Sequence, residues 1–303
     1  GIIRSKFNKL IFFNLNNKMF DEYTKLLSAG SAQPNISGSD IGKFRIALPP
    51  SEKIRKLSYV LDNLDSHVNN IITQTQQSIE ELKKYKQSLI TEAVTKGLDP
   101  NVEMKDSGIE WIGKIPKHWE VIKLKYLTEI RDEKREFSSG DIYVGLENVL
   151  SHDGELKDII VLEKSSREQA FLKGDILYSK LRPYLAKAFI AGFDGSCSGE
   201  FIVLKNYKGV KEHLLYWLIN YKFTTYINST TYGAKMPRSS WDNIKETLMP
   251  YPGINEQKEI IKYINQRTSI INKLIANKQQ VIKELESYKK SLIYEYVTGK
   301  KTV

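Results

Sequence analysis

A long internal repeat limits the folds that this chain can adopt. The stretch EELKKYKQSLITEAVTKG (residues 80–97) returns as KELESYKKSLIYEYVTGK (residues 283–300), an offset of 203 residues. The same offset, applied without a gap, aligns Tyr85 with Tyr288 and Pro34 with Pro237. Residues 1–97 therefore correspond to residues 204–300, and we expect two copies of one structural unit.

The segment between the two copies has no counterpart of its own. Its equivalent, for residues from about 105 to 203, would lie before Gly1. If the two copies were equal in length, the first would need roughly 99 further residues upstream. We therefore expect that the sequence begins within the first copy.

Each copy ends in a long amphipathic pattern. Apolar residues recur at steps of three and four through residues 57–89 and again through residues 260–292, which predicts two helices of about 40 residues, on the order of 60 Å long. We expect the two apolar stripes to pack together as an antiparallel coiled coil. In the alternative, each helix packs only on its own domain. The predicted seam residues are Leu64, Val68, Leu82, Ile271, Leu274 and Leu285.

The segment ahead of the second long helix is different in character. Residues 119–252 contain short β-like runs such as DIYVGLENV, GDILYSKL and EFIVLKNY, separated by turns at Asp153-Gly154 and Asp194-Gly195. A helical pattern follows at residues 211–227. The predicted fold class is therefore α+β, with mixed α/β domains joined by two long helices.

Composition narrows the classes of protein. A chain of 303 residues with 41% hydrophobic and 27% charged residues is long enough for two domains with proper cores. The single cysteine, Cys197, cannot form an internal disulfide, so we expect a reducing cytoplasm. No apolar run is long enough to span a membrane. A net charge of +10 favours polyanionic partners.

Several motifs resemble those of one known family. MKDSGIEWIGKIPKHWEVIKLKYL (residues 104–127) is followed in order by YVGLENV (143–149), GDILYSKLRPYLAKA (174–188) and GAKMPRSSWDNI (233–244). With these motifs and the paired helix ends, the chain resembles, over essentially its whole length, the specificity subunit of Type I restriction-modification enzymes.

The resemblance implies a plan of four segments. Residues 1–50 would be the C-terminal remnant of a first target-recognition domain, 51–100 the first conserved helix, 101–251 the complete second target-recognition domain and 252–303 the second conserved helix. In the family, each recognition domain reads one half of a split site on double-stranded DNA. The helices space the two halves and hold the methyltransferase subunits, to which restriction subunits are added. A truncated first domain would leave one half-site unread or read by another chain.

One candidate segment for DNA contact is YSKLRPYLAK. It places Lys180, Arg182, Tyr184 and Lys187 around Pro183. Such a turn can present a guanidinium to a guanine edge and ammonium groups to phosphates. The alternative is a solvated basic loop without a ligand.

The second candidate segment, YGAKMPRSSW, adds Lys235 and Arg238, with Ser239 and Ser240 as donors to phosphate oxygens. Its counterpart in the first copy, SAGSAQPNISGS, keeps the glycine and the proline but changes their neighbours. Gln33 and Asn35 of that counterpart are candidates for reading an adenine edge. In the alternative, the two prolines only shape a turn.

The sequence contains no motif for catalysis or for a cofactor. It has four scattered histidines, no cysteine cluster, no GxxxxGK[ST] loop and no glycine-rich or NPPF-like motif of S-adenosylmethionine enzymes. We therefore predict a DNA-reading subunit without catalytic residues, metal or cofactor, rather than a self-contained nuclease or methyltransferase. A structural coiled-coil interaction protein without DNA readout is the alternative.

Overall fold

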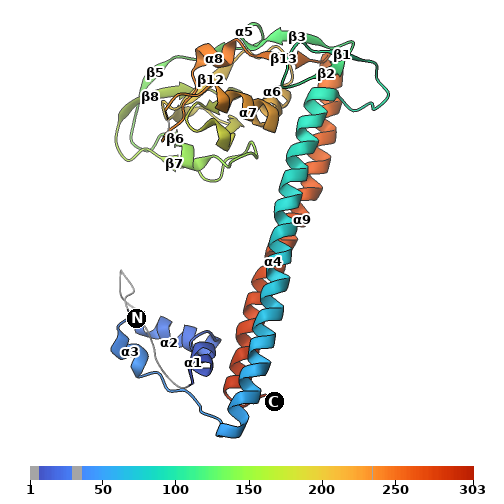
Figure 1. Cartoon of the computed structure of the whole chain (residues 1–303). Helices are drawn as coiled ribbons and strands as arrows, with labels where there is room; N and C mark the ends of the chain where they lie inside the picture. The colour runs from blue at the N-terminus through green and yellow to red at the C-terminus, as the bar shows by residue number, and fades with distance from the viewer. Residues whose placement is uncertain (1–6, 29–35, 234) are drawn as a thin grey trace. The chain divides into compact units, whose positions relative to one another are not determined.

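The computed structural model describes residues 7–28, 36–233 and 235–303 of the chain. These residues form two compact units, one with residues up to Leu82 together with Asn272–Val303, and one with Lys83–Ile271. Both helices and sheets are present (Figure 1), which confirms the predicted α+β class.

The helices return at the offset of the sequence repeat. Within the described residues, four pairs of helices begin 203 residues apart: α1 (Asn8–Asn14) with α6 (Lys211–Ile219), α2 (Lys18–Ser28) with α7 (Tyr221–Ser229), α3 (Gly38–Gly42) with α8 (Trp241–Lys245), and α4 (Ser51–Lys96) with α9 (Ile254–Val297). α3 and α8 also end at the same offset. The repeat in the sequence is therefore a repeat of helical structure.

Equivalent side chains start the equivalent helices. Asn17 precedes α2 and Asn220 precedes α7, and each side-chain oxygen accepts the backbone N–H three residues later, at 3.2 and 3.0 Å. Ser37 and Ser240 accept in the same way at the starts of α3 and α8, at 3.2 and 3.3 Å. Such a side chain satisfies a donor that the first helical turn leaves without a partner. Both copies therefore begin these helices for the same reason.

In the first unit, α4 and α9 pack in opposite directions. Leu61 of α4 shares a buried cluster with Ile293 and Val297 of α9. One turn further along α4, Asp65 accepts a hydrogen bond of 2.9 Å from Lys289, which lies one turn earlier in α9. The order of contacts along the two helices is therefore reversed, as the predicted antiparallel coiled coil requires.

The same two helices pair in the second unit. Gly97 follows the end of α4 with a φ of +74°, and a Cβ there would lie 3.2 Å from Trp119 and 3.3 Å from Glu256 in the first turn of α9. The end of one helix thus meets the start of the other. Figure 1 shows the two ribbons side by side in both units.

The predicted seam is correct for most of its residues and wrong at Leu274. Val68 and Ile271 are 4% and 5% exposed, whereas Leu274 is 45% exposed. In α9 the inward positions follow steps of four and three through Thr268, Ile271, Ile275 and Lys278. Because Thr268 and Lys278 are polar, they hide this register in the sequence, and Ile275 takes the inward position that we assigned to its neighbour. The remaining seam residues, Leu64, Leu82 and Leu285, are partly buried.

The second unit also holds the strands. In chain order these and the short helices are β1 (Met104–Asp106), β2 (Lys114–Pro116), β3 (Glu120–Lys123), α5 (Leu124–Leu127), β4 (Glu129–Ile130), β5 (Lys134–Phe137), β6 (Ile142–Val144), η1 (Leu146–Asn148), β7 (Ile160–Val161), β8 (Ser166–Phe171), β9 (Ile176–Ser179), η2 (Pro183–Leu185), β10 (Ala188–Ile190), β11 (Gly195–Cys197), β12 (Phe201–Lys205) and β13 (Leu248–Tyr251). The larger sheets have the orders β10-β9-β12-β4 and β5-β8-β11-β6-β7, and β1-β2 and β13-β3 form pairs. Pairing is antiparallel except between β11 and β6.

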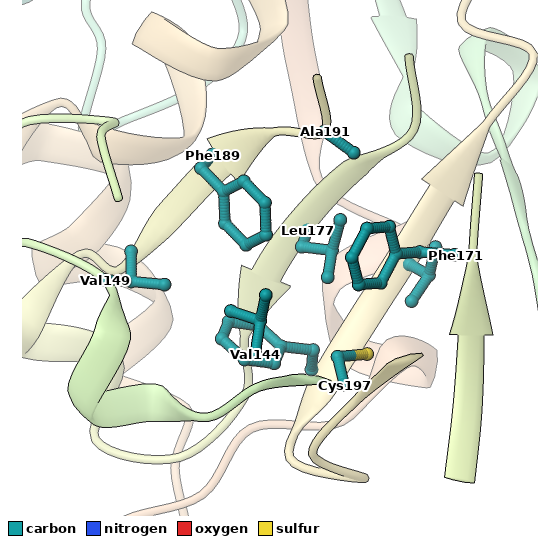
Figure 2. Packing of buried hydrophobic residues seen from close by; sticks show 9 residues of the cluster. Val144, Val149, Phe171, Leu177, Phe189, Ala191 and Cys197 are labelled. Atoms are coloured by element: carbon teal, nitrogen blue, oxygen red, sulfur yellow. The ribbon is translucent and has the colours of Figure 1, made fainter. Parts of the chain in front are cut away.

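One apolar core joins the two larger sheets. Phe171 of β8 lies against Phe189 of β10 with ring centroids 6.2 Å apart, and Phe189 lies 6.1 Å from Phe201 of β12. Figure 2 shows these strands around the cluster, with Val144 and Leu177 also inside. This core fixes β9 and β10, and the loop between these two strands carries the first candidate segment.

His213 of α6 occupies a position that is apolar in the other copy. Its counterpart is Leu10, which belongs to the buried cluster of the first unit. His213 is 0% exposed, and neither ring nitrogen has a hydrogen-bond partner among the described residues. Burial lowers the pKa of His213 to about 3, so its imidazole is neutral in the folded protein.

We predict that Leu61→Ala lowers the free energy of unfolding of the first unit by about 2–5 kcal/mol, because it leaves a cavity between α1, α4 and α9. Leu274→Ala, at an exposed position of the same unit, should change it by less than about 0.5 kcal/mol. Urea denaturation followed by circular dichroism measures both. Equal losses would show that Leu274 packs as tightly as Leu61.

We also predict that His213→Leu stabilises the second unit, because leucine removes two buried nitrogens without partners, each costing about 1–3 kcal/mol. Between pH 6.5 and about 3, the unfolded histidine binds a proton that the folded one does not. The parent should therefore lose about 1.4 kcal/mol per pH unit, relative to His213→Leu, as pH falls through this range. Parallel pH profiles of the two proteins would contradict this.

Candidate nucleic-acid interface

The first candidate segment is the loop of a β-hairpin. β9 and β10 pair antiparallel, and residues 180–187 connect them. The short helix η2 lies in this loop, with Pro183 at its first position. Arg182 and Ala186, on either side of η2, have positive φ angles of 50° and 45°. Residues other than glycine rarely adopt this backbone conformation, so contacts with neighbouring residues must stabilise the loop.

The second candidate segment runs antiparallel beside the first. The Arg182 N–H donates to the Pro237 carbonyl at 2.7 Å, and the Ser239 N–H donates to the Lys180 carbonyl at 2.9 Å. Between these bonds Arg238 pairs with Leu181 as an isolated β-bridge. Two segments that are far apart in the sequence therefore form one surface, residues 180–187 with 235–240, which we name the paired-loop surface.

Three predicted residues are available on this surface. Arg182, Tyr184 and Lys235 are exposed, and Tyr184 is 44% exposed. Among the described residues, the Arg182 guanidinium and the Lys235 ammonium form no hydrogen bond or ion pair. Lys180 is partly buried beside them. These cations are free to meet an anion, and the tyrosine ring offers a flat apolar face.

Two other predicted cations already have partners within the domain. Lys187 Nζ donates to the Leu146 carbonyl at 2.6 Å. Arg238 Nη2 forms an ion pair with Glu200 Oε1 at 2.6 Å, with 41% of the arginine side chain exposed. Lys187 therefore links the loop to the backbone of η1, and Glu200 orients the guanidinium of Arg238. No local sequence pattern indicates Glu200, because long-range contacts of residues 180 and 238 bring it to this site.

The remaining predicted residues are a buried serine and two residues that the structure does not describe. Ser239 is 0% exposed, so its burial does not fit the predicted role as a phosphate donor. Its neighbour Ser240 is used as the cap of α8. Gln33 and Asn35 lie outside the residues that the structure describes.

Charged residues in and near β5 form ion pairs with one another. Arg135 donates to Glu133 at 2.7 Å, a contact that lowers the pKa of the carboxyl group. Arg131 binds Asp175 at 2.6 Å, and this hydrogen bond raises the pKa of the guanidinium. No group of three or more potential His, Cys, Asp or Glu metal ligands occurs in residues 7–28, 36–233 and 235–303. Within the same ranges, no helix is long and apolar enough to cross a membrane.

The chain is similar to proteins described as specificity subunits of Type I restriction enzymes. The chain is 24% identical over 258 residues to the Type I restriction enzyme EcoDI specificity subunit of Escherichia coli, covering 78% of this chain and 58% of that protein. It is 26% identical over 308 residues to the MjaVIII specificity subunit of Methanocaldococcus jannaschii, covering 96% and 69%. The chain therefore spans little more than half of the E. coli relative.

A solved structure supports the fold. One chain of a type I R-M system, studied for complex assembly and conformational transition, superimposes with a TM-score of 0.71 at 14% identity, covering 97% of this chain and 73% of that one. A sequence model of the Type I restriction modification DNA specificity domain matches residues 2–81 and 116–284. Because this match covers most of the sequence, the chain belongs to the family of Type I restriction modification DNA specificity domains.

Proposed function

We propose that this chain is a non-catalytic, sequence-specific DNA-binding subunit of a Type I restriction-modification complex. The paired-loop surface carries the proposal, because backbone hydrogen bonds join two basic segments into one exposed surface. Family membership and the net charge of +10 agree with it. The structural coiled-coil alternative gives no role to exposed cations held on a strained loop.

Each exposed residue has a distinct chemistry for DNA. Arg182 has a planar fork of donors that matches the O6 and N7 acceptors of guanine. Lys180 and Lys235 are point charges suited to phosphates. Tyr184 can pack against a sugar or a thymine methyl group. Arg238, whose guanidinium is paired with Glu200, would be a second reader.

The repeat supports reading of a bipartite site. α4 has 46 residues and α9 has 44, which corresponds to about 65–70 Å of helix. Successive turns of a DNA major groove are about 34 Å apart, so each helix is about as long as two such turns. In this proposal residues 101–251 read one half-site, and the domain to which residues 1–50 belong reads the other.

The proposal includes protein partners. The two long helices would hold the methyltransferase subunits, and restriction subunits would join that assembly. Catalysis and cofactor binding would belong to these partners. The cytoplasm is the proposed location, which agrees with the buried, unpaired thiol of Cys197.

We predict that Arg182→Ala costs about 1–3 kcal/mol on the preferred duplex and reduces discrimination against unrelated DNA. Lys235→Ala should weaken all duplexes alike and lower the salt dependence by about one counterion. The preferred site comes from selection of a randomised duplex library with the parent chain. Titrations at two salt concentrations then compare these variants with Lys258→Ala, an exposed lysine of α9.

Melting temperatures first establish that each of these variants is folded. If folded Arg182→Ala and Lys235→Ala bind preferred and random duplexes as tightly as the parent, the paired-loop surface does not read DNA. A parent chain that retains no preferred sequence from the library would favour the structural coiled-coil alternative.

We also predict that the purified chain binds neither ATP nor S-adenosylmethionine and does not cleave DNA in the presence of Mg²⁺, because its sequence lacks nucleotide and metal motifs. Isothermal titration calorimetry and a plasmid-nicking assay measure these properties. A stoichiometric heat with either cofactor would assign catalytic work to this chain.

A further inference from the structure

We propose that Lys86 and Gln87 of α4 are positioning residues for DNA recognition. They hold the turn at His152 and Asp153, and this turn holds the loop that carries Arg182. The proposal rests on the proposed function of the paired-loop surface. It gives the long helix α4 a part in orienting that surface. All of these residues belong to the second unit.

The first contacts join the helix to the turn. Gln87 Nε2 donates to the His152 carbonyl at 3.0 Å. Lys86 forms an ion pair with Asp153, and the lysine side chain is only 9% exposed. A buried cation that loses its carboxylate partner is strongly unfavourable. The turn is therefore tightly fastened to α4.

The next contact joins the turn to the loop. The His152 N–H donates to the Ala186 carbonyl at 3.3 Å, and the backbone of Tyr184 lies beside the His152 imidazole. Arg182 directly precedes η2, and Ala186 directly follows it. Displacement of the turn would therefore move the end of the segment that presents Arg182.

Backbone conformations single out the same path. Of the four non-glycine residues with positive φ in the described chain, three lie on it: His152 at 64°, Arg182 at 50° and Ala186 at 45°. Each such residue costs free energy and persists only where neighbouring contacts hold it. Strained backbone is thus concentrated between α4 and the exposed guanidinium.

In the other copy of the repeat, the residues at the same helical positions also bind neighbouring elements through their side chains. Lys289 and Lys290 are the counterparts of Lys86 and Gln87. Lys289 donates to Asp65 at 2.9 Å, and Lys290 donates to Asp21 of α2 at 2.6 Å. In both copies, this part of the long helix anchors neighbouring elements of its own unit. For Lys86 and Gln87, in the first copy, the anchored element is the turn at His152 and Asp153.

Lys86→Met and Gln87→Leu test the inference in the full chain, with Lys84→Met as a matched control at an exposed position of α4. Each test variant should lose about threefold to tenfold of the preference for the library-selected duplex over a scrambled one, a size typical of residues that act through others. The salt dependence should not change, because no phosphate contact is removed. Lys86→Arg keeps the cation and should keep the preference.

A second readout needs no DNA. Hydrogen exchange followed by NMR reports on the amides of His152 and Arg182, which donate to Ala186 and Pro237. Both should exchange faster in Lys86→Met and Gln87→Leu than in the parent or in Lys84→Met, since opening of the turn exposes them. Gln87→Leu removes a single hydrogen bond and is the deciding variant if Lys86→Met does not fold.

The outcomes separate the two proposals. Parental preference and parental exchange rates in the test variants would overturn the positioning role while leaving DNA reading by Arg182 intact. Uniformly weaker binding with a lower salt dependence would show that Lys86 touches DNA itself, which also overturns it. A parent without sequence preference would refute the proposed function, and the exchange rates would still decide whether α4 holds the loop.

Discussion

The contact between α4 and α9 is the interaction on which the rest of the structure depends. A single amphipathic helix of this length exposes its whole apolar stripe and is marginal in water. Pairing buries the stripe, with Leu61 and Ile293 at 0% and 1% exposed in the first unit and Ile90 and Ile264 both at 0% in the second. The buried residues of one unit are the repeat counterparts of the buried residues of the other: Leu61 corresponds to Ile264, and Ile90 to Ile293. One packing solution therefore serves two places in the molecule.

Periodicity and repetition in the sequence were enough to predict the long helices and their pairing. The repeat predicted two copies of one structural unit, which the structure shows as four pairs of helices, and the apolar steps predicted the antiparallel coiled coil. The register failed at Leu274 because Thr268 and Lys278 occupy inward positions, and a polar residue at a seam leaves no apolar signal. Local patterns describe faces of helices well, but the choice between adjacent residues depends on the partner helix.

The candidate interface was less accessible to sequence reasoning. Both basic segments were visible in the sequence. The hydrogen bonds that join them, from Arg182 to Pro237 and from Ser239 to Lys180, are long-range and leave no local pattern. The burial of Ser239 and the pairing of Arg238 with Glu200 follow from that joining. Tertiary contacts thus sort the predicted cations into those that face solvent and those that brace the loop.

The left-handed backbone at Arg182 has a consequence for how such a domain changes its target. At a φ of 50°, branched side chains such as valine or isoleucine are strongly disfavoured, whereas asparagine and glycine are tolerated. Tyr184, inside η2, carries no such restriction. Under the proposed function, new DNA specificities should therefore arise more readily by substitution at Tyr184 than at Arg182, where the backbone conformation restricts the choice of residue.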